Sequence, residues 1–272
     1  MQQLTIVTQG GLCNRLRVVL SALYFSQHTE VPVRVEWTKH QECFAHFTDL
    51  FMPIEAENFC ITPMKWWHTP VERKNLHLPA LIRLPLYDRQ IKNFLPSKHG
   101  EVSLLTQQHP RLYLSTCYSI MDYPQEVAHI LRPTPEIQQE IDVITQLFAP
   151  HTIGVHIRRT DNKESISGSP TTAFIDAMKM EVEKNRDVRF FVATDDVSVR
   201  ALLQNTFPSR IITQEFHKCH RDTLSGMKQA VVDLFCLSKT SKIIGSYWSS
   251  FTDTAVELGN MPVIIAGKEN AL

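Results

Sequence analysis

The fold of this chain is decided by the segment Gly154-Val155-His156-Ile157-Arg158-Arg159-Thr160-Asp161. Residues 152–157 are mainly β-branched and apolar and carry no charge until Arg158, which predicts a buried strand of a parallel sheet. In open α/β sheets, ligands bind outside the carboxyl ends of the strands. Guanidinium groups grip phosphate oxygens bidentately and stay charged. Arg158 and Arg159 are therefore candidates for binding a polyanion; the alternative is a solvated pair or one bound to surface acids.

The composition is that of a soluble globular protein, with 43% hydrophobic and 21% charged residues among 272. Lys plus Arg equals Asp plus Glu at 28 each, so no general field favours nucleic acid or an anionic membrane. The sequence shows neither a signal peptide nor an apolar run of the roughly 18 residues that span a membrane. Six scattered cysteines without C-x-x-C indicate reduced, mostly buried thiols. We expect a cytoplasmic protein without a transmembrane segment, which leaves peripheral membrane association open.

The amino-terminal part begins with a strand, two glycines and a helix. Residues 4–8 predict the strand, Gly10-Gly11 break it, and residues 14–27 predict a helix with one apolar face. A helix start offers free N–H groups, and glycines let a ligand approach the backbone. Gly11, Asn14 and Arg15 are thus expected at a ligand-facing turn. The pattern is neither G-x-G-x-x-G nor a P-loop, and many such turns use Gly-Gly for geometry alone.

The remaining pattern predicts the α/β class. Residues 33–37 and 112–115 predict strands, and the proline-rich stretch between them predicts irregular structure with short helices around Leu81 and Ile91. Thr134-Pro135 begins a helix that is expected to run over 136–148. Strands at 152–158, 188–193, 210–213, 243–244 and 263–266 then alternate with helices, one capped by Ser169-Pro170 and one ending with Gly259 at C′. This predicts doubly wound, Rossmann-like domains at 1–150 and 151–272.

Acidic residues mark two further positions. Asp195-Asp196 end the strand at 188–193, on the same sheet edge as Arg158. Asp196 suits a helix N-cap, which leaves Asp195 to meet a ligand ribose or to pair with Arg159; a metal site is a competing, weaker interpretation, because the acids are adjacent. Asp233 flanks the apolar face of the helix expected at 224–237, where an unpaired charge is costly. Guanine would supply two donors there, and a structural salt bridge is an equal alternative.

Two further clusters carry hydroxyl, thiol or imidazole groups. Ser249 and Ser250 precede a helix and would donate to a phosphate, or would simply cap that helix. His217, Cys219 and His220 look like half of a zinc site, but zinc normally needs a second ligand pair at a distance, and none is evident. We therefore expect structural or solvated roles for these three residues, and no metal site.

Four ordered motifs resemble those of fucosyltransferases. Residues 9–16 are similar to the G-G-x-x-N opening of these enzymes, and residues 156–161 match the H-x-R-R-x-D motif of α1,2-, α1,6- and protein O-fucosyltransferases. Residues 191–196 match the strand-T-D-D segment of the α1,6 group, which includes the nodulation enzymes. Residues 233–238, followed by 249–251, are similar to that group's last donor motif. The resemblance is strong over 9–25 and 152–260 and essentially absent over 38–130.

This resemblance implies an inverting transferase in which two Rossmann-like domains face each other across a cleft, the GT-B arrangement. It implies GDP-fucose as donor, held mainly by the carboxyl-terminal domain, an oligosaccharide or glycoconjugate as acceptor, and no metal or other cofactor. Matching positions imply these roles: Arg158 holds the diphosphate, His156 contacts the nucleotide, Asp233 reads guanine, Ser249 and Ser250 hold phosphate, and Asn14 touches the diphosphate or the sugar.

The sequence departs from the family pattern at two places. Cys13 stands where a glycine is typical, and Ile166 stands near the place of an acid of the α1,6 enzymes, with Glu164 the nearest carboxylate. The catalytic base is therefore open between Asp161 and Glu164, and Asp161 would alternatively orient Arg159. Two other functions remain as alternatives: a transferase that uses another GDP-hexose, and a nucleotide-sugar-binding protein without catalysis.

Overall fold

A computed structural model describes residues 2–63, 81, 85–98, 100–160, 162–214 and 221–268. These residues form two compact units, and each contains one parallel five-stranded sheet. The first unit holds the described residues up to Thr134 together with 221–227, and the second holds 135–214 and 228–268. Within the described ranges, no helix has both the length and the apolar character needed to cross a bilayer.

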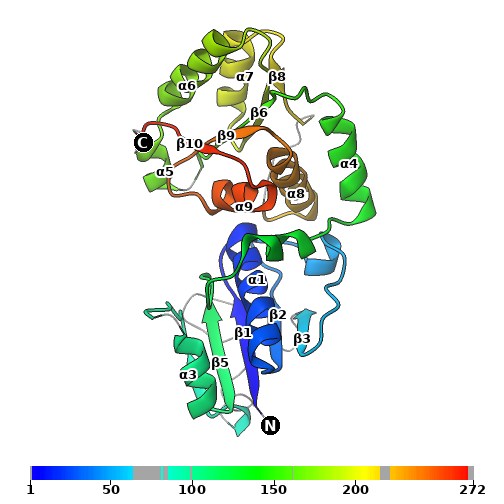
Figure 1. Cartoon of the computed structure of the whole chain (residues 1–272), viewed down its shortest axis with the longest axis vertical. Coiled ribbons are helices and arrows are strands. Elements are labelled where there is room, and N and C mark those ends of the chain that lie inside the picture. Colours follow the sequence, from blue (N-terminus) through cyan, green and yellow to red (C-terminus); the bar gives the residue numbers. More distant parts are fainter. Residues whose placement is uncertain are drawn as a thin grey trace. The chain divides into compact units, whose positions relative to one another are not determined.

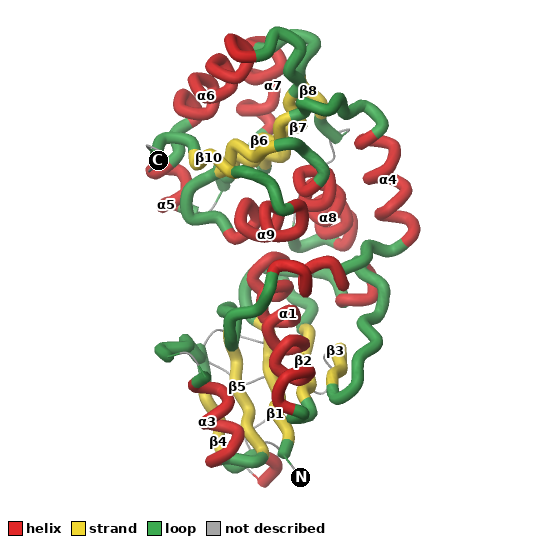
Figure 2. Tube along the Cα trace, in the orientation of Figure 1, coloured by secondary structure: helices red, strands yellow, loops and turns green. Residues whose placement is uncertain are grey.

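The first unit is a parallel sheet in the order β3-β2-β1-β5-β4. Its helix α1 runs beside β1 and β2 (Figures 1 and 2). The main elements are β1 (Gln3–Thr8), α1 (Leu12–Thr29), β2 (Val33–Trp37), β3 (Phe59–Pro63), β4 (Arg89–Ile91), α3 (Glu101–Gln108) and β5 (Arg111–Thr116), with two 3₁₀ turns, η1 (Phe47–Asp49) and η2 (Gln125–Ile130). The predicted strand–glycine–helix opening is confirmed.

The first unit differs from the prediction at Ile91. This residue lies in β4, paired with Leu114 of β5, and not in a short helix. A strand of three residues is too short to show a periodicity in the sequence. Its place at the edge of the sheet is determined by pairing with β5. β3 and α3 were missed in the same proline-rich stretch, and the surroundings of Leu81 lie outside the described residues.

The second unit is a parallel sheet in the order β10-β9-β6-β7-β8. Its elements are α4 (Pro135–Thr145), β6 (Ile153–Ile157), α5 (Lys163–Gly168), α6 (Thr171–Lys184), β7 (Phe190–Thr194), α7 (Val197–Thr206), β8 (Ile211–Ile212), most of α8 (Leu224–Ser238), β9 (Lys242–Gly245), α9 (Ser250–Gly259) and β10 (Val263–Ile265). The predicted class, α/β with two Rossmann-like sheets, is confirmed.

The division between the units lies at Thr134, earlier than the expected boundary at residue 150. The reason is that α4 packs against the second unit. Glu136 forms an ion pair with Lys228 of α8, and the Phe148 ring contacts the Phe191 ring of β7 at 5.5 Å between centroids.

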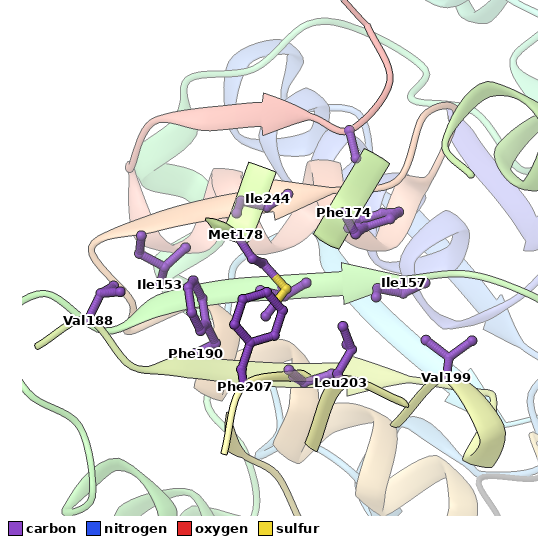
Figure 3. Packing of buried hydrophobic residues seen from close by; sticks show 13 residues of the cluster. Ile153, Ile157, Phe174, Met178, Val188, Phe190, Val199, Leu203, Phe207 and Ile244 are labelled. Atoms are coloured by element: carbon purple, nitrogen blue, oxygen red, sulfur yellow. The ribbon is translucent and has the colours of Figure 1, made fainter. Parts of the chain in front are cut away.

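The core of the second unit explains why β6 was recognisable from sequence. Every residue of β6 is buried. Phe174 and Met178 of α6 lie against it, and Leu203 of α7 packs beside Phe190 and Phe207 (Figure 3). A central strand that is covered in this way is expected to be mainly apolar, and His156 is the one polar side chain of β6.

The order of the strands places a binding position at the end of β6. The chain builds β6, β7 and β8 outward in one direction and then returns to add β9 and β10 on the other side of β6. Such a reversal is a topological switch point, where ligands bind outside the carboxyl ends of the two diverging strands. Residues that directly follow β6 and β9 therefore form the candidate site.

Candidate functional site

Arg158 leaves β6 at the switch point and is held at both ends. Its guanidinium pairs with Asp195 at 3.0 Å, and the side chains of the two residues are 28% and 12% exposed. Its backbone N–H donates to Oγ of Ser246 at 3.0 Å, and that hydroxyl donates to the carbonyl of His156 at 3.1 Å. Ser246 directly follows β9, so the ends of both diverging strands position Arg158.

Asp195 serves as the acceptor around which this turn folds. Besides the guanidinium, it accepts the N–H of Arg159 at 2.8 Å, the N–H of Thr160 at 3.3 Å and the Thr160 hydroxyl at 2.7 Å. Of the two predicted roles of Asp195, pairing with Arg159 occurs through the backbone N–H, while the ion pair is formed with the Arg158 side chain. With this many donors already bound, Asp195 positions Arg158, which disfavours the predicted contact with a ribose.

The Arg159 side chain is engaged within the protein. Its guanidinium donates to the carbonyls of Ser169 and Arg158, both at 2.8 Å, and to Oγ1 of Thr171 at 3.2 Å. The same group lies over the ring of Phe174, 5.5 Å from the centroid. Arg159 thus ties the turn to the start of α6, which disfavours the predicted contact of its side chain with a phosphate.

His156 is almost entirely buried, with 6% of its surface exposed. Its Nδ1 lies 2.8 Å from Oγ1 of Thr252, and its ring stacks on Phe251 at 4.7 Å. Burial, reinforced by the positive charge of Arg158, lowers the pKa of His156 to about 3. The ring is therefore neutral at working pH and fixes the first turn of α9; its contact with a nucleotide stays a prediction.

The start of α9 leaves its N-cap side chain without a capping bond. Ser249 occupies the N-cap position and is 7% exposed, but its hydroxyl makes no bond to the first turn, and Ser250 is the first helical residue. The position expected for capping is right, while the predicted side-chain cap is not formed. The helix ends at Gly259, and Asn260 takes the left-handed conformation that was expected of that glycine.

Two hydroxyl groups whose bonding partners the sequence does not predict connect turns of the second unit. Ser169 donates to the carbonyl of Ala266 at 2.6 Å and accepts the N–H of Tyr247 at 2.9 Å, whereas the N-cap of α6 is Pro170. Together with Ser246 it links segments that are far apart in sequence. No periodicity marks such residues; their only signal is a position just outside a strand or helix.

Asp233 lies on α8, where an amide is its hydrogen-bond partner. Nε2 of Gln214 donates to its carboxylate at 2.6 Å and also to the carbonyl of Gln229 at 2.9 Å. Part of the Asp233 surface remains accessible among apolar neighbours. Removal of water raises the pKa of this carboxyl to about 7, against the opposing effects of Gln214 and the Arg200 charge. A ligand that brings two hydrogen-bond donors would stabilise the ionised form of this carboxyl group.

In the first unit, the Arg15 side chain holds the Gly-Gly turn, and Gly10 of this turn lies close to Asn14. Arg15 is fully buried: Nε donates to the Gly10 carbonyl at 2.8 Å, Nη1 to the Thr38 carbonyl, and Nη2 lies 3.0 Å from His40. The expectation that Arg15 faces a ligand was therefore wrong. Gly10 has φ +78°, and a Cβ there would lie 2.7 Å from Nδ2 of Asn14. Gly11 is the N-cap of α1 and, as a glycine, has no side chain with which to cap the first turn.

The remaining candidates are acidic residues and the residues of the possible half zinc site. Asp161, His217, Cys219 and His220 lie outside the described residues. Glu164 is exposed in the first turn of α5. Asp196 caps α7 as predicted, accepting the N–H groups of Ser198 and Val199 at 2.8 and 3.2 Å. Protein donors thus engage both carboxylates of the Asp195–Asp196 pair, which disfavours their use as metal ligands. Among the described side chains, no three His, Cys, Asp or Glu residues form a metal-binding group.

Replacing Gly245 with alanine is expected to destabilise the second unit by about 1–3 kcal/mol, because an added Cβ would overlap Thr252. Thr252 would then move away from His156, whose Nδ1 it contacts. Thermal melts of the variant should show a lower midpoint. Adding Thr252→Ser removes the methyl group but keeps the hydroxyl, so the double variant should partly recover. A midpoint unchanged from that of the unmodified protein would contradict this packing.

Comparison with solved structures shows that the chain has the fold of known fucosyltransferases. A NodZ α-1,6-fucosyltransferase crystal soaked with GDP-fucose matches with a TM-score of 0.61 and 18% identity, over 95% of this chain and 93% of that chain. NodZ from Bradyrhizobium gives 0.59 and 16%, over 94% and 93%.

More distant sequences share the same fold. A variant of Arabidopsis thaliana FUT1 in complex with GDP gives a TM-score of 0.62 and 14% identity, over 99% and 71% of the two chains. POFUT1 in complex with GDP gives 0.59 and 12%, over 97% and 99%. The match establishes a GT-B-like α/β fold with two parallel sheets. No protein-family model matches the sequence, and no curated protein matches it.

Proposed function

We propose that this protein is an inverting glycosyltransferase that moves L-fucose from GDP-fucose to a hydroxyl group of a glycan or glycoconjugate. The observation that carries the proposal is the placement of Arg158 at the switch point of the second sheet, fixed by Asp195 and Ser246. The four fucosyltransferase-like motifs and the fold shared with NodZ, which was soaked with GDP-fucose, support it.

Arg158 would act on the leaving group. In a single displacement the acceptor oxygen bonds to the anomeric carbon while the bond from that carbon to the GDP oxygen breaks, and negative charge builds on the β-phosphate. A guanidinium already held by Asp195 has little reorganisation left to undergo, so it stabilises this growing charge more than the ground state. The backbone N–H groups at the start of α9 would also stabilise this negative charge, since a helix N-terminus favours anions.

Asp233 would recognise the base. Its carboxylate can accept both the N1–H and the exocyclic amine of guanine, and this would repay the cost of ionising a poorly hydrated acid. Gln214, whose amide bridges Asp233 and the carbonyl of Gln229, would fix the orientation of the carboxylate.

The base that takes the acceptor proton is assigned to a carboxylate. His156 does not suit this role, because it is buried and its pKa of about 3 makes it a weak base. Glu164 is exposed at the start of α5, and Asp161 precedes that helix in sequence. Comparing kcat of Glu164→Gln and Asp161→Asn, each with its GDP affinity measured separately, would distinguish the two carboxylates.

A titration with a panel of nucleotide sugars tests the proposed function. Thermal melts and calorimetry should show binding of GDP and GDP-fucose, weaker binding of GDP-mannose, and much weaker binding of UDP-glucose. EDTA should leave the affinity for GDP unchanged. With a matching glycan acceptor, GDP should be released and a fucosylated product formed with inverted configuration.

Three results of this titration would change the proposal. Equal use of GDP-mannose would favour a transferase for another GDP-hexose. Donor binding without GDP release, over a broad range of glycans, would favour the non-catalytic alternative, which suits Ile166 in place of an acid. Failure of GDP to bind at all would refute the assignment.

A further inference from the structure

Trp248 presents its side chain to solvent from a backbone conformation that bulky residues avoid. It lies in the turn between β9 and α9, with 71% of its surface exposed. Its φ is +52°, in the left-handed region where a bulky non-glycine residue is an outlier. Strained residues of this kind persist only where the surrounding structure holds them, and they cluster at functional sites.

The surroundings of Trp248 provide this restraint on both sides. Nδ2 of Asn162 donates to the Trp248 carbonyl at 2.9 Å, and the preceding N–H, that of Tyr247, donates to Ser169 at 2.9 Å. The Tyr247 ring lies under the ammonium of Lys268, 4.2 Å from the centroid. Asn162 is in turn fixed as the N-cap of α5, accepting the N–H of Ser165. The backbone of Trp248, which carries the exposed indole, is therefore held in place before any ligand binds.

The strand order places Trp248 on a definite side of Arg158. Neighbouring strands lie roughly 4.8 Å apart. Gln214, the partner of Asp233, follows β8, which is separated from β6 by β7, whereas Trp248 follows β9 on the opposite side of β6. If Asp233 holds the guanine and Arg158 the diphosphate, the sugar end of the donor points toward β9. The indole then lies at the sugar end and not at the base.

We propose that Trp248 is a stacking platform for a substrate pyranose, a role that rests on the proposed function. A pyranose ring has an apolar face of C–H groups, which suits the flat surface of an indole. Two rings would meet this chemistry: the fucose of the donor and the sugar of the acceptor. Because Trp248 lies outside the residues that hold the diphosphate, its contribution should appear only with ligands that carry a sugar ring.

The test compares Trp248→Ala and Trp248→Phe with Met180→Ala, which removes an exposed apolar side chain toward the far end of α6. Calorimetry with GDP should give the same affinity in all forms. In Trp248→Ala, the affinity for GDP-fucose should fall, or the KM for an accepted oligosaccharide should rise, by about tenfold, which corresponds to about 1.4 kcal/mol. Trp248→Phe should retain most of the effect, since it keeps a ring.

Fluorescence gives a readout that does not need turnover. GDP-fucose, lactose, N-acetyllactosamine and chitotetraose are each titrated into the unmodified protein and Trp248→Phe, with GDP bound in the oligosaccharide titrations. The change in indole emission should be present in the first and lost in the second. A response to GDP-fucose alone identifies the donor sugar as the stacked ring, and a response to an oligosaccharide identifies the acceptor.

The outcomes separate the two proposals. If GDP does not bind the unmodified protein, the proposed function fails. If GDP binds normally, but Trp248→Ala leaves GDP-fucose affinity and acceptor KM within twofold and no sugar alters the Trp248-dependent emission, the platform is refuted. Loss of GDP affinity itself in a folded Trp248→Ala protein would also refute it, because the residue would then contact the nucleotide.

Discussion

Replacing Arg158 with alanine is expected to weaken GDP binding at least a hundredfold, or about 3 kcal/mol. The guanidinium is the cation that the switch point presents from the end of β6, and Asp195 holds it in place. Because the proposed mechanism places its charge at the leaving group, kcat/KM for GDP-fucose should fall further than the affinity for GDP does. Calorimetry with GDP and initial rates with GDP-fucose measure the two effects.

The variant should remain folded, so the loss can be assigned to binding. Asp195 keeps the N–H groups of Arg159 and Thr160 and the Thr160 hydroxyl as donors, and the backbone N–H of residue 158 still reaches Ser246. Arg158→Lys retains the charge but loses the planar guanidinium, so its GDP affinity should lie between those of the unmodified protein and Arg158→Ala.

Arg186→Ala is the matched control. Arg186 is exposed and precedes β7, so it lies toward the amino ends of the parallel strands, whereas Arg158 lies at their carboxyl ends. Its removal should leave GDP affinity unchanged. A GDP-induced shift in melting temperature that is the same in Arg158→Ala as in the unmodified protein would show that Arg158 is not the phosphate ligand.

The sequence predicts an element well where one residue pattern determines it. β6 is buried along its whole length, so its apolar run and the charges that follow it are visible without a structure. Asp196 was recognisable as a cap because its partners lie two and three residues ahead. In contrast, β4 has three residues and depends on pairing with β5, so no local pattern predicts it.

The direction of a polar side chain is harder to predict than its position. Arg15 and Arg159 were both expected at a ligand, and both turn toward backbone carbonyls of their own units. Whether an arginine binds a ligand or a carbonyl depends on which acceptors the fold brings near, and Thr38 and Ser169 are brought there by the tertiary structure. The bond between Ser246 and Arg158 was not predicted for the same reason, since the two residues are 88 positions apart in sequence.

Replacing Asp233 with asparagine is expected to stabilise the unliganded protein at pH 8 while weakening its GDP binding. In the folded protein the pKa of Asp233 is raised from 3.8 to about 7. The folded state therefore binds the proton of the Asp233 carboxyl group more tightly than the unfolded chain does. The stability that this protonated group contributes at low pH is lost as the pH rises to about 7. The resulting penalty above pH 7 is on the order of 4 kcal/mol, from about 1.4 kcal/mol per pKa unit.

Asparagine removes the titration but keeps an oxygen to accept from Gln214. The gain in stability over the unmodified protein should thus grow from pH 5 to pH 7 and stay constant to pH 8. Asp176→Asn, which neutralises an exposed carboxylate on α6, should show no such gain. Denaturant unfolding at several pH values, without nucleotide, measures this difference.

Binding should respond in the opposite direction. In the unmodified protein only the carboxylate form accepts both guanine donors, so GDP affinity should rise with pH up to about 7. Asp233→Asn should bind GDP at least tenfold more weakly at pH 8, lose this pH dependence and no longer distinguish GDP from ADP, because an amide offers one acceptor where the carboxylate offers two. A variant that is more stable at pH 8 yet keeps its full preference for GDP would show that Asp233 has a structural role and that guanine is recognised elsewhere.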